Sequence, residues 1–524
     1  MNRRERWLVS PWRRGVVAAL AGALPVFAFP APSLWWFAYV ALVPWILLVR
    51  SAPTAKRAAY DGWLGGLGFM LAVHHWLLPS LHVFTLVIAA LLGALWAPWG
   101  WLVRRFLGGV PSAGQIAAAL VVLPSGWLMV ELVRSWQGLG GPWGLLGSSQ
   151  WQVDPALRLA SVGGVWLLSF LVVTVNVAVA VLVSVRQARI PAVAGLVATA
   201  AATSAAWVWS PRPDVDGRVR IAVVQPGVID GIASGEKRFA REESLTRTLA
   251  GQDVDLIVWG ESSVGFDLAD RPDLANRIAA LSRLTGADVL VNVDARRSDR
   301  PGIYKSSVLV GPEGPTGDRY DKMRLVPFGE YVPARSVLGW ATSVGKAAGE
   351  DRRQGTEQVV MNVGNGLRVG PMVCFESAFP DMSRHLAQDG AEVLLAQSST
   401  SSFQKSWAPE QHASLAALRA AETGRSMVHA TLTGVSAVYG PSGERVGSWL
   451  GTDAATTMVY EVPLARGVTP YVRFGDWPVH AALLVLAALC ATEGARALRL
   501  RRPAPPPPVP PARTVHESPA HPGH

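Results

Sequence analysis

The chain has 524 residues, of which 50% are hydrophobic and only 16% are charged, and its formal net charge is +10. A soluble protein carries about 25% charged residues, so the composition argues against a wholly soluble chain. Residues 211–470 hold 28 Lys/Arg and 31 Asp/Glu, net −3, whereas the rest holds 20 and 7, net +13. The positive excess therefore surrounds the hydrophobic segments, which disfavours a nucleic-acid-binding protein and favours an integral membrane protein.

Eight apolar stretches approach the length of about 20 residues that crosses a bilayer. They cover residues 15–29, 34–49, 63–78, 83–103, 116–133, 159–185, 191–209 and 479–495. The first two and the seventh are short or interrupted by proline, so their ends are the least well defined. We expect a multi-span α-helical membrane bundle of about eight spans, with seven in residues 1–210 and the eighth in residues 471–500.

Basic residues gather on alternate sides of these stretches and so predict an orientation. They precede the first stretch and follow the second, fourth, sixth and eighth, as at Arg13, Arg50, Arg104, Arg186 and Arg496. By the positive-inside rule, both termini are expected in the cytoplasm and residues 211–470 outside it. An N-terminal signal peptide is the alternative, but no Ala-x-Ala-like site follows the first stretch. The Pro-rich residues 501–524 are expected to form a disordered cytoplasmic tail.

Residues 211–470 alternate short apolar runs with amphipathic segments. Runs such as "VRIAVVQPGV", "VDLIVWGES" and "AEVLLAQSS" are typical of buried strands, whereas "PDLANRIAALSRLTG" is typical of a helix. This alternation favours an α/β domain. Catalytic groups in such domains gather at the carboxyl ends of the strands.

Three residues of this domain are candidates for chemistry. Glu261 follows "DLIVW", Lys322 lies in "YDKMRLVPFGEYVP", and Cys374 follows "RVGPMV". Each has an ordinary structural alternative: a turn or helix cap, a surface lysine, and a small buried hydrophobe. The other cysteine, Cys490, falls in the last apolar stretch. Because cysteines outside the cytoplasm tend to be paired, an unpaired thiol there is better explained as a nucleophile than as half of a disulfide.

Taken together, Glu261, Lys322 and Cys374 resemble the Glu–Lys–Cys catalytic set of the nitrilase (carbon–nitrogen hydrolase) superfamily, in the same chain order. The eight spans, with the domain between the seventh and eighth, are similar to those of the apolipoprotein N-acyltransferases, the membrane-embedded branch of that superfamily. The segments "GGPWGLLGSSQWQ" and "KMRLVPFGEYVP" are also similar to motifs of that family.

The resemblance implies a nitrilase-like αββα sandwich and a role for each site residue. Cys374 is the expected nucleophile, Glu261 the general base and acid, and Lys322 the oxyanion stabiliser. Glu330, Phe375 and Glu376 are expected to support them, in particular through the Phe375 backbone N–H. The reverse assignment, with Glu330 as the base, stays open. A carboxylate base works best when burial raises its pKa towards neutrality, and we expect this for Glu261.

The resemblance also implies the reaction. A fatty acyl chain would pass from a membrane phospholipid to the N-terminal amine of the diacylglyceryl-cysteine of an apolipoprotein, through a Cys374 thioester. This ping-pong reaction is the last step of bacterial lipoprotein maturation in the cytoplasmic (inner) membrane. It requires no metal or other cofactor.

Three departures from the family pattern keep other functions open. Gly260 stands where proline usually precedes the catalytic Glu, Ser398–Thr400 replace a Ser-Asn-Asp-like turn, and a tryptophan usual after "QPGV" is missing. A membrane-tethered amidase would use the same three residues with water as the acceptor. A catalytically weakened paralogue or scaffold is the other alternative.

The apolar segment around Trp340, between Arg335 and Lys346, is a candidate lid over the site. We expect it to dip into the outer leaflet of the membrane. The alternative is a loop packed into the core of the domain.

Overall fold

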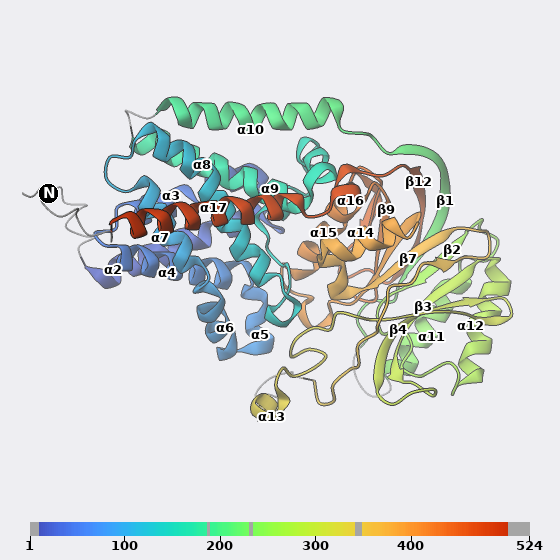
Figure 1. Cartoon of the computed structure of the whole chain (residues 1–524). Coiled ribbons are helices and arrows are strands. Elements are labelled where there is room, and N and C mark those ends of the chain that lie inside the picture. The colour runs from blue at the N-terminus through green and yellow to red at the C-terminus, as the bar shows by residue number, and fades with distance from the viewer. Residues whose placement is uncertain (1–9, 186–188, 230–233, 341–347, 501–524) are drawn as a thin grey trace, which may run out of the picture.

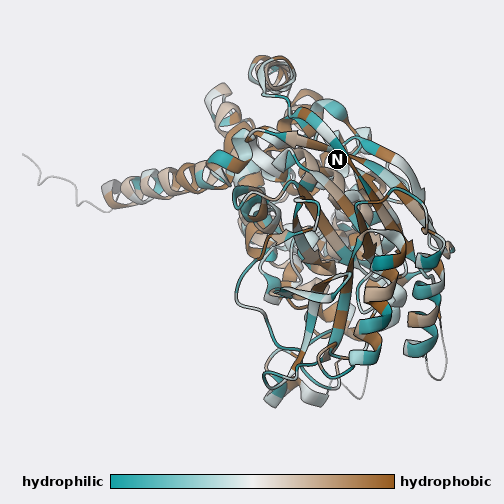
Figure 2. Ribbon diagram, turned by 90° about the vertical axis from the view of Figure 1, so that its right-hand side faces the viewer, coloured by the Kyte–Doolittle hydropathy of each residue, from teal (hydrophilic) through white to brown (hydrophobic). Residues whose placement is uncertain are grey.

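The computed structural model describes residues 10–185, 189–229, 234–340 and 348–500. Figure 1 shows a helical part, built from residues 10–185 and 189–209 and the last long helix, beside an α/β part. Hydrophobic residues, brown in Figure 2, run along the helices of the first part. The two parts meet along one side of the α/β domain.

The helical part contains fewer long helices than the sequence predicts. By length and apolar composition, four described helices can each cross a membrane: α8 (Ala113–Arg134), α9 (Asp154–Ser184), α10 (Arg189–Trp209) and α17 (Trp477–Leu500). Two bent pairs raise this number to as many as six. They are α4 (Ala55–Val73) with η3 (His75–Leu77) and α5 (Leu78–Leu81), and α6 (Val83–Gly93) with α7 (Trp96–Leu107).

The first two expected spans fold as shorter helices, so the described helices do not reach the expected count of eight. They are α2 (Pro11–Ala23) with η1 (Leu24–Ala28), and η2 (Trp35–Tyr39) with α3 (Val43–Arg50). Pro25 and Pro44 lie in the first turns of η1 and α3, where a proline is tolerated, and each marks a new helix start.

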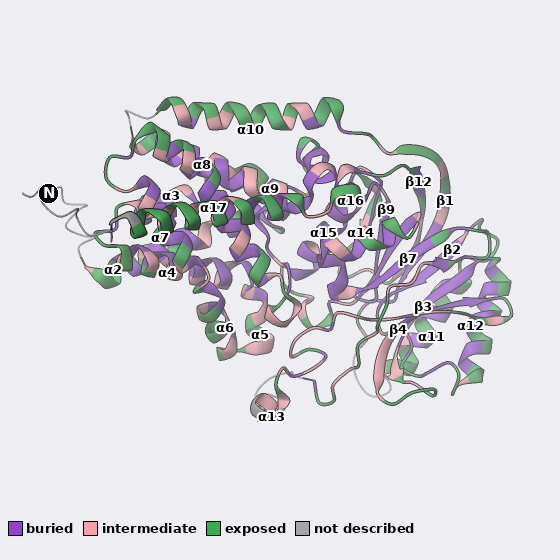
Figure 3. Ribbon diagram, viewed as in Figure 1, coloured by how far each residue is buried: buried purple, intermediate pink, exposed green. Residues whose placement is uncertain are grey.

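Four fully buried tryptophans form the centre of the helical part. Trp45, Trp96, Trp99 and Trp127 come from α3, α7 and α8, and their ring centroids lie 5.1–6.4 Å apart. Aromatic pairs at these separations stabilise packing beyond the area they bury. By contrast, α10 and α17 are mostly exposed, as the green residues in Figure 3 show.

The α/β domain consists of two six-stranded sheets. The first has the order β12-β1-β2-β3-β4-β5 and the second β11-β10-β9-β8-β7-β6. In chain order the strands are β1 (Asp214–Gln225), β2 (Leu256–Trp259), β3 (Asp288–Arg296), β4 (Ile303–Gly311), β5 (Gly314–Asp321), β6 (Met361–Asn362), β7 (Arg368–Val373), β8 (Val393–Ser398), β9 (Ser426–Thr431), β10 (Ser436–Tyr439), β11 (Arg445–Leu450) and β12 (Thr456–Arg466).

Buried side chains from both sheets, such as Val223, Leu290, Val373 and Val428, share one core. Helices α11 (Ser234–Arg247) and α12 (Pro272–Thr285) cover the outer face of the first sheet. Helices α14 (Pro380–Gln388) and α15 (Ala408–Thr423) cover the outer face of the second. The αββα layering expected for this domain is therefore confirmed.

Helix α15 joins this domain to the helical part through a break in α9. Gly163 and Gly164 have non-helical dihedral angles inside α9. The break frees the backbone N–H of Val165, which donates to Glu422 Oε1 of α15 at 2.8 Å. Tyr471 of α16 (Pro470–Phe474) packs against Gly164, where an added Cβ would lie 2.6 Å from its ring.

Replacing Gly164 with alanine is expected to destabilise this junction. Gly164 has φ +67° and ψ −173°, a region open essentially only to glycine. The strain and the clash with Tyr471 together should cost about 2 kcal/mol or more. The thermal midpoint of purified Gly164→Ala in one detergent should fall by several degrees, whereas Gly494→Ala, which meets no neighbour within 4 Å, should not lower it. An unchanged midpoint for Gly164→Ala would contradict the strained junction.

Candidate active site

The three candidate residues come from the ends of three strands. Glu261 lies two residues after β2, Lys322 directly after β5, and Cys374 directly after β7. Strands β2 and β5 belong to the first sheet and β7 to the second, so the residues meet where the two sheets face each other. Glu261 and Lys322 are buried, and Cys374 is partly exposed.

Two carboxylates and two ammonium groups form the centre of the site. Lys322 Nζ lies 2.7 Å from Glu330 Oε1 and 3.3 Å from Glu261 Oε1. Lys305 Nζ lies 2.8 Å from Glu261 Oε1 and 3.2 Å from Glu330 Oε1. The sequence predicted Glu261, Lys322 and Glu330 as neighbours but gave no role to Lys305.

This arrangement reverses the expected pKa shift of Glu261. Burial acts to raise the pKa of its carboxyl group, but the charges of Lys305 and Lys322 outweigh it and hold the pKa below the usual value. The same lysines lower the pKa of the buried Glu330. The pKa of Lys322 is raised because both carboxylates offset the burial of its ammonium group. Glu261 is therefore ionised at neutral pH.

Cys374 begins a short 3₁₀ helix, η8 (Cys374–Ala378), in a strained conformation. Its φ of +51° is uncommon for a residue with a side chain. The backbone N–H of Phe375 lies in the first turn of this helix, where it has no acceptor within the helix. Burial, followed by the Glu261 charge, raises the pKa of the Cys374 thiol to about 12. The thiol is therefore protonated at rest and needs a base to become a nucleophile.

Glu376 holds the loop of Cys374 against the loop of Lys322. Its Oε1 accepts hydrogen bonds from the Tyr320 hydroxyl at 2.7 Å and from the backbone N–H groups of Met323 and Arg324 at 2.7 and 3.0 Å. Its Oε2 accepts from the N–H of Val373 at 2.7 Å. This carboxyl group thus fixes the distance between the nucleophile and the lysine.

A histidine that sequence reasoning missed lies behind the nucleophile. His412 Nε2 is 3.0 Å from the Cys374 carbonyl oxygen and 2.9 Å from Ser377 Oγ. Burial lowers the pKa of His412 to about 4, so its ring is neutral. It lies in α15, within "PEQHASLAALRAAETG", and its place in a segment predicted to be helical was the only sequence signal.

A loop and a short 3₁₀ helix of the other part of the molecule pack against the site. The Gly141 backbone packs against the Phe375 ring, where an added Cβ would lie 2.5 Å away. The centroid of the Trp143 ring lies 5.2 Å from that of His412, with the rings tilted, and 5.4 Å from that of Trp76, in a T-shaped arrangement. The loop holding Gly141 and Trp143 is anchored by the buried Arg134, whose guanidinium donates to the carbonyl oxygens of Trp143 and Gly144.

Gln411, next to His412 in α15, reaches the helical part directly. Its Oε1 accepts from Trp76 Nε1 at 3.2 Å, and its Nε2 donates to the Pro30 carbonyl oxygen at 2.9 Å. The candidate lid residue Trp340 also meets the helical part, since its ring lies 5.2 Å from that of Phe84 in α6. Its side chain is 53% exposed, so a loop packed in the domain core does not describe it.

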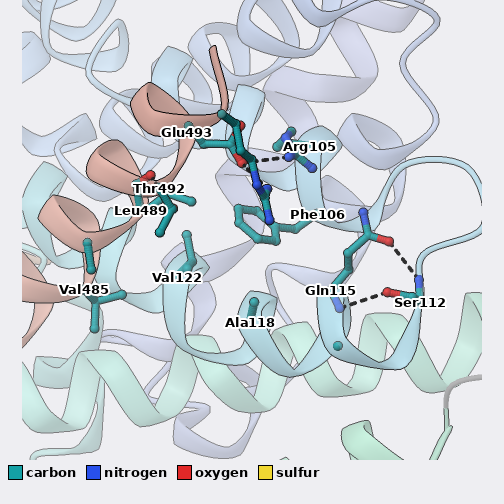
Figure 4. Close-up of a pocket in the computed structure, with 13 residues that line it drawn as sticks. Arg105, Phe106, Ser112, Gln115, Ala118, Val122, Val485, Leu489, Thr492 and Glu493 are labelled. Atoms are coloured by element: carbon teal, nitrogen blue, oxygen red, sulfur yellow. Dashed lines mark hydrogen bonds and ion pairs between the residues drawn. The ribbon is translucent and has the colours of Figure 1, made fainter. Parts of the chain in front are cut away.

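A cavity of about 600 Å³ lies elsewhere, between α7, α8 and α17. Figure 4 shows its apolar wall of Val122, Val485 and Leu489 and the Arg105–Glu493 ion pair, 2.8 Å long, at its rim. None of the candidate site residues lines it. Across the described ranges, no three His, Cys, Asp or Glu side chains are grouped to hold a metal ion.

Both halves of the chain match known families. Residues 21–178 match the profile described as apolipoprotein N-acyltransferase N-terminal domain, and residues 220–469 match carbon–nitrogen hydrolase. The apolipoprotein N-acyltransferase of Azotobacter vinelandii is 31% identical, over 94% of this chain and 98% of its own length. That of Geobacter metallireducens is 30% identical, over 91% and 95%.

The chain belongs to the apolipoprotein N-acyltransferase family.

Among solved structures, Saccharomyces cerevisiae Nit3, of the nitrilase superfamily, is 15% identical. The structural match covers 48% of this chain and 92% of the Nit3 chain, with a TM-score of 0.37.

The departures from the family pattern at Gly260 and at Ser398–Thr400 lie together. An added Cβ at Gly260 would lie 1.9 Å from the Leu432 backbone nitrogen, so glycine is required here. The Ser398 carbonyl oxygen accepts from the backbone N–H groups of Glu261 and Leu432, at 3.1 and 2.9 Å. These residues therefore hold the backbone of Glu261 in place.

Replacing Glu376 with glutamine is expected to loosen the site. An amide group keeps one acceptor oxygen, so it loses either the single hydrogen bond to Oε2 or the three to Oε1. Leaving buried donors unsatisfied should cost about 1–3 kcal/mol, measured as a lower thermal midpoint in detergent together with weaker activity. The matched control is Glu357→Gln, at an exposed position, which should change neither. Equal behaviour of the two variants would contradict the role given to Glu376.

Proposed function

We propose that this protein transfers a fatty acyl chain from a membrane phospholipid to the α-amino group of the diacylglyceryl-cysteine at the N-terminus of apolipoproteins. The observation that carries the proposal is the buried Glu261–Lys322–Glu330 cluster beside Cys374, in a chain that matches this family over nearly its whole length. The reaction then follows from what each side chain can do.

In the first half-reaction, Cys374 Sγ attacks the carbonyl carbon of the phospholipid ester. The Sγ proton passes to Glu261, and the carbonyl electron pair moves to oxygen. Lys322 and the Phe375 N–H stabilise this oxyanion, and losing one such donor typically lowers the rate about 10²–10³-fold. When the intermediate collapses, the ester oxygen leaves with the proton held by Glu261. The products are a lysophospholipid and the Cys374 thioester.

In the second half-reaction, the α-amino nitrogen of the lipoprotein attacks the thioester carbon. The amine gives its proton to Glu261, the carbon–sulfur bond breaks, and the departing sulfur regains a proton from Glu261. The product is an amide, which is more stable than the thioester, so transfer proceeds without an external energy source.

The hydrogen bonds of the two carboxylates favour Glu261 over Glu330 as the base. Glu330 Oε1 binds Lys322, and its Oε2 accepts from the Val326 N–H at 2.8 Å. Both lysines bind Oε1 of Glu261, and no hydrogen bond among the described residues involves its Oε2. That oxygen can accept the thiol proton, whereas Glu330 serves to hold Lys322.

The remaining parts of the chain serve substrates that stay in the bilayer. Residues 1–210 form seven spans, residues 211–470 the extracytoplasmic catalytic domain, residues 471–500 the eighth span, and residues 501–524 a cytoplasmic tail. Both termini lie in the cytoplasm of a bacterial cell, and the site opens towards the outer leaflet of the cytoplasmic membrane. The contacts of Gly141 and Trp76 near the site support this placement.

The chemistry is tested by intact mass spectrometry of protein incubated with phospholipid vesicles. Wild type and Cys490→Ser should gain the mass of one acyl chain, removable by neutral hydroxylamine, and Cys374→Ser should gain none. A diacylated lipopeptide should then discharge the adduct and become triacylated. Discharge by water alone would indicate the amidase-type alternative. No adduct on a folded protein would overturn the proposed function and indicate a scaffold.

Trp340 is proposed to be part of a lid that meets the outer leaflet, because its exposed ring contacts Phe84 of α6. Trp340→Asp should lower acyl transfer from vesicles by more than about three-fold, since it places a charge against apolar groups. Trp340→Phe, which keeps an aromatic ring, should stay close to wild type. A Trp340→Asp enzyme within about three-fold of wild type would rule out the lid.

A further inference from the structure

Lys305 is a second buried lysine at the site. It lies on β4, and its carbonyl oxygen accepts a hydrogen bond from the Lys322 N–H at 2.8 Å, so adjacent strands place the two lysines side by side. Its side chain is only 12% exposed. Its Nζ donates to Glu261 Oε1 at 2.8 Å and to Ser262 Oγ at 3.3 Å.

The distances from Lys305 Nζ indicate that it binds the carboxylates of the site, Glu261 and Glu330, more closely than it binds Asp294. Asp294, opposite Lys305 on β3, is its third acidic neighbour, at 3.7 Å, farther away than Glu261 and Glu330. Asp294 also has a cation of its own, Arg352, at 3.4 Å. The shortest contact of Lys305 is thus the one to Glu261.

Charge balance gives Lys305 a task that Lys322 cannot perform alone. Two carboxylates with one lysine would leave a net negative charge in a buried place, which opposes formation of a thiolate or an oxyanion. With both lysines, Glu261, Glu330, Lys305 and Lys322 sum to zero. When Glu261 takes the thiol proton and the substrate oxygen becomes negative, the sum remains zero.

We propose that Lys305 is a positioning residue for the acyl transfer. It fixes Oε1 of Glu261, keeps this carboxylate ionised, and leaves Oε2 to accept the proton of Cys374. This inference rests on the proposed function, because it takes Glu261 as the base.

Other titratable or charged groups around Glu261 stay in place when Lys305 is changed. They are Lys322, Glu330 and Cys374 at the site, Asp294 and Arg352 behind Lys305, and the neutral His412 of α15. Removing one positive charge from this set raises the pKa of Glu261. Since the base must be ionised to act, the acidic limb of the rate profile moves to higher pH.

The experiment compares Lys305→Met with wild type, both carrying Cys490→Ser so that Cys374 is the only thiol. The rate of acyl-enzyme formation from phospholipid vesicles is measured against pH. The acidic limb of Lys305→Met should lie about 1–3 pH units higher. Lys305→Arg, which keeps the charge, should restore the limb towards wild type. The control Lys237→Met, at an exposed position, should leave the profile unchanged.

A second variant separates the effect of Lys305 on Glu261 from its effect on Asp294. Lys305→Met with Asp294→Asn also removes the carboxylate of Asp294, the contact of Lys305 that lies outside the Glu261–Glu330 pair. If Lys305 only neutralised Asp294, this double variant would regain the wild-type profile, which would overturn the proposal. A limb that stays at higher pH in the double variant supports it.

Alkylation of Cys374 by iodoacetamide gives a readout that needs no acyl donor. Without Lys305 the thiolate is less stable, so alkylation at a given pH should be slower than in the Cys490→Ser parent. A merely loosened site would expose the thiol and make alkylation faster, which would overturn the proposal. The two proposals can also fail separately. If the Cys490→Ser parent forms no acyl-enzyme but Lys305→Met is still alkylated more slowly than that parent, the charge effect of Lys305 is supported and the proposed function is rejected.

Discussion

The site depends on four buried charges of alternating sign. An isolated buried charge is unstable, so Glu261, Lys305, Glu330 and Lys322 are tolerated only because each lies within 3.3 Å of two opposite charges. Their side chains come from the ends of β2 and β5, from β4, and from the loop after β5. The register of the first sheet is therefore constrained by electrostatics as well as by its apolar core. A shift of one residue in β4 would turn Lys305 to the other face of the sheet.

The second sheet brings the nucleophile to these charges through hydrogen bonds. Glu376 connects the end of β7 to the segment after β5, across the two sheets. His412 supports the Cys374 carbonyl oxygen from the opposite side. Cys374 can keep its left-handed backbone conformation because neighbours on two sides determine its position. The thiol, in turn, lies among charges that balance one another.

Much of the α/β domain could be predicted from its sequence, because its strands are continuous apolar runs and its motifs are specific. The proximity of Glu261, Lys322 and Cys374 followed from their place at strand ends. Lys305 was missed because the apolar pattern of its strand becomes clear only at Ser306, whereas β4 begins at Ile303. The pKa of Glu261 was expected to be raised, but it is lowered. The expectation considered the burial of the carboxyl group and not the charge of Lys305, which had been missed. The first two predicted spans are each divided into shorter helices, because hydropathy does not register where prolines start new helices.

Helix α15 carries Gln411 and His412 as consecutive residues, and they face different parts of the molecule. Gln411 binds Pro30 and Trp76, whereas His412 binds the carbonyl group of the nucleophile. The α/β domain is consequently not an independent module that happens to be tethered. Without the helical part, Gln411 would lose its contacts with Pro30 and Trp76. Gln411 is the residue next to His412, which holds the carbonyl group of Cys374.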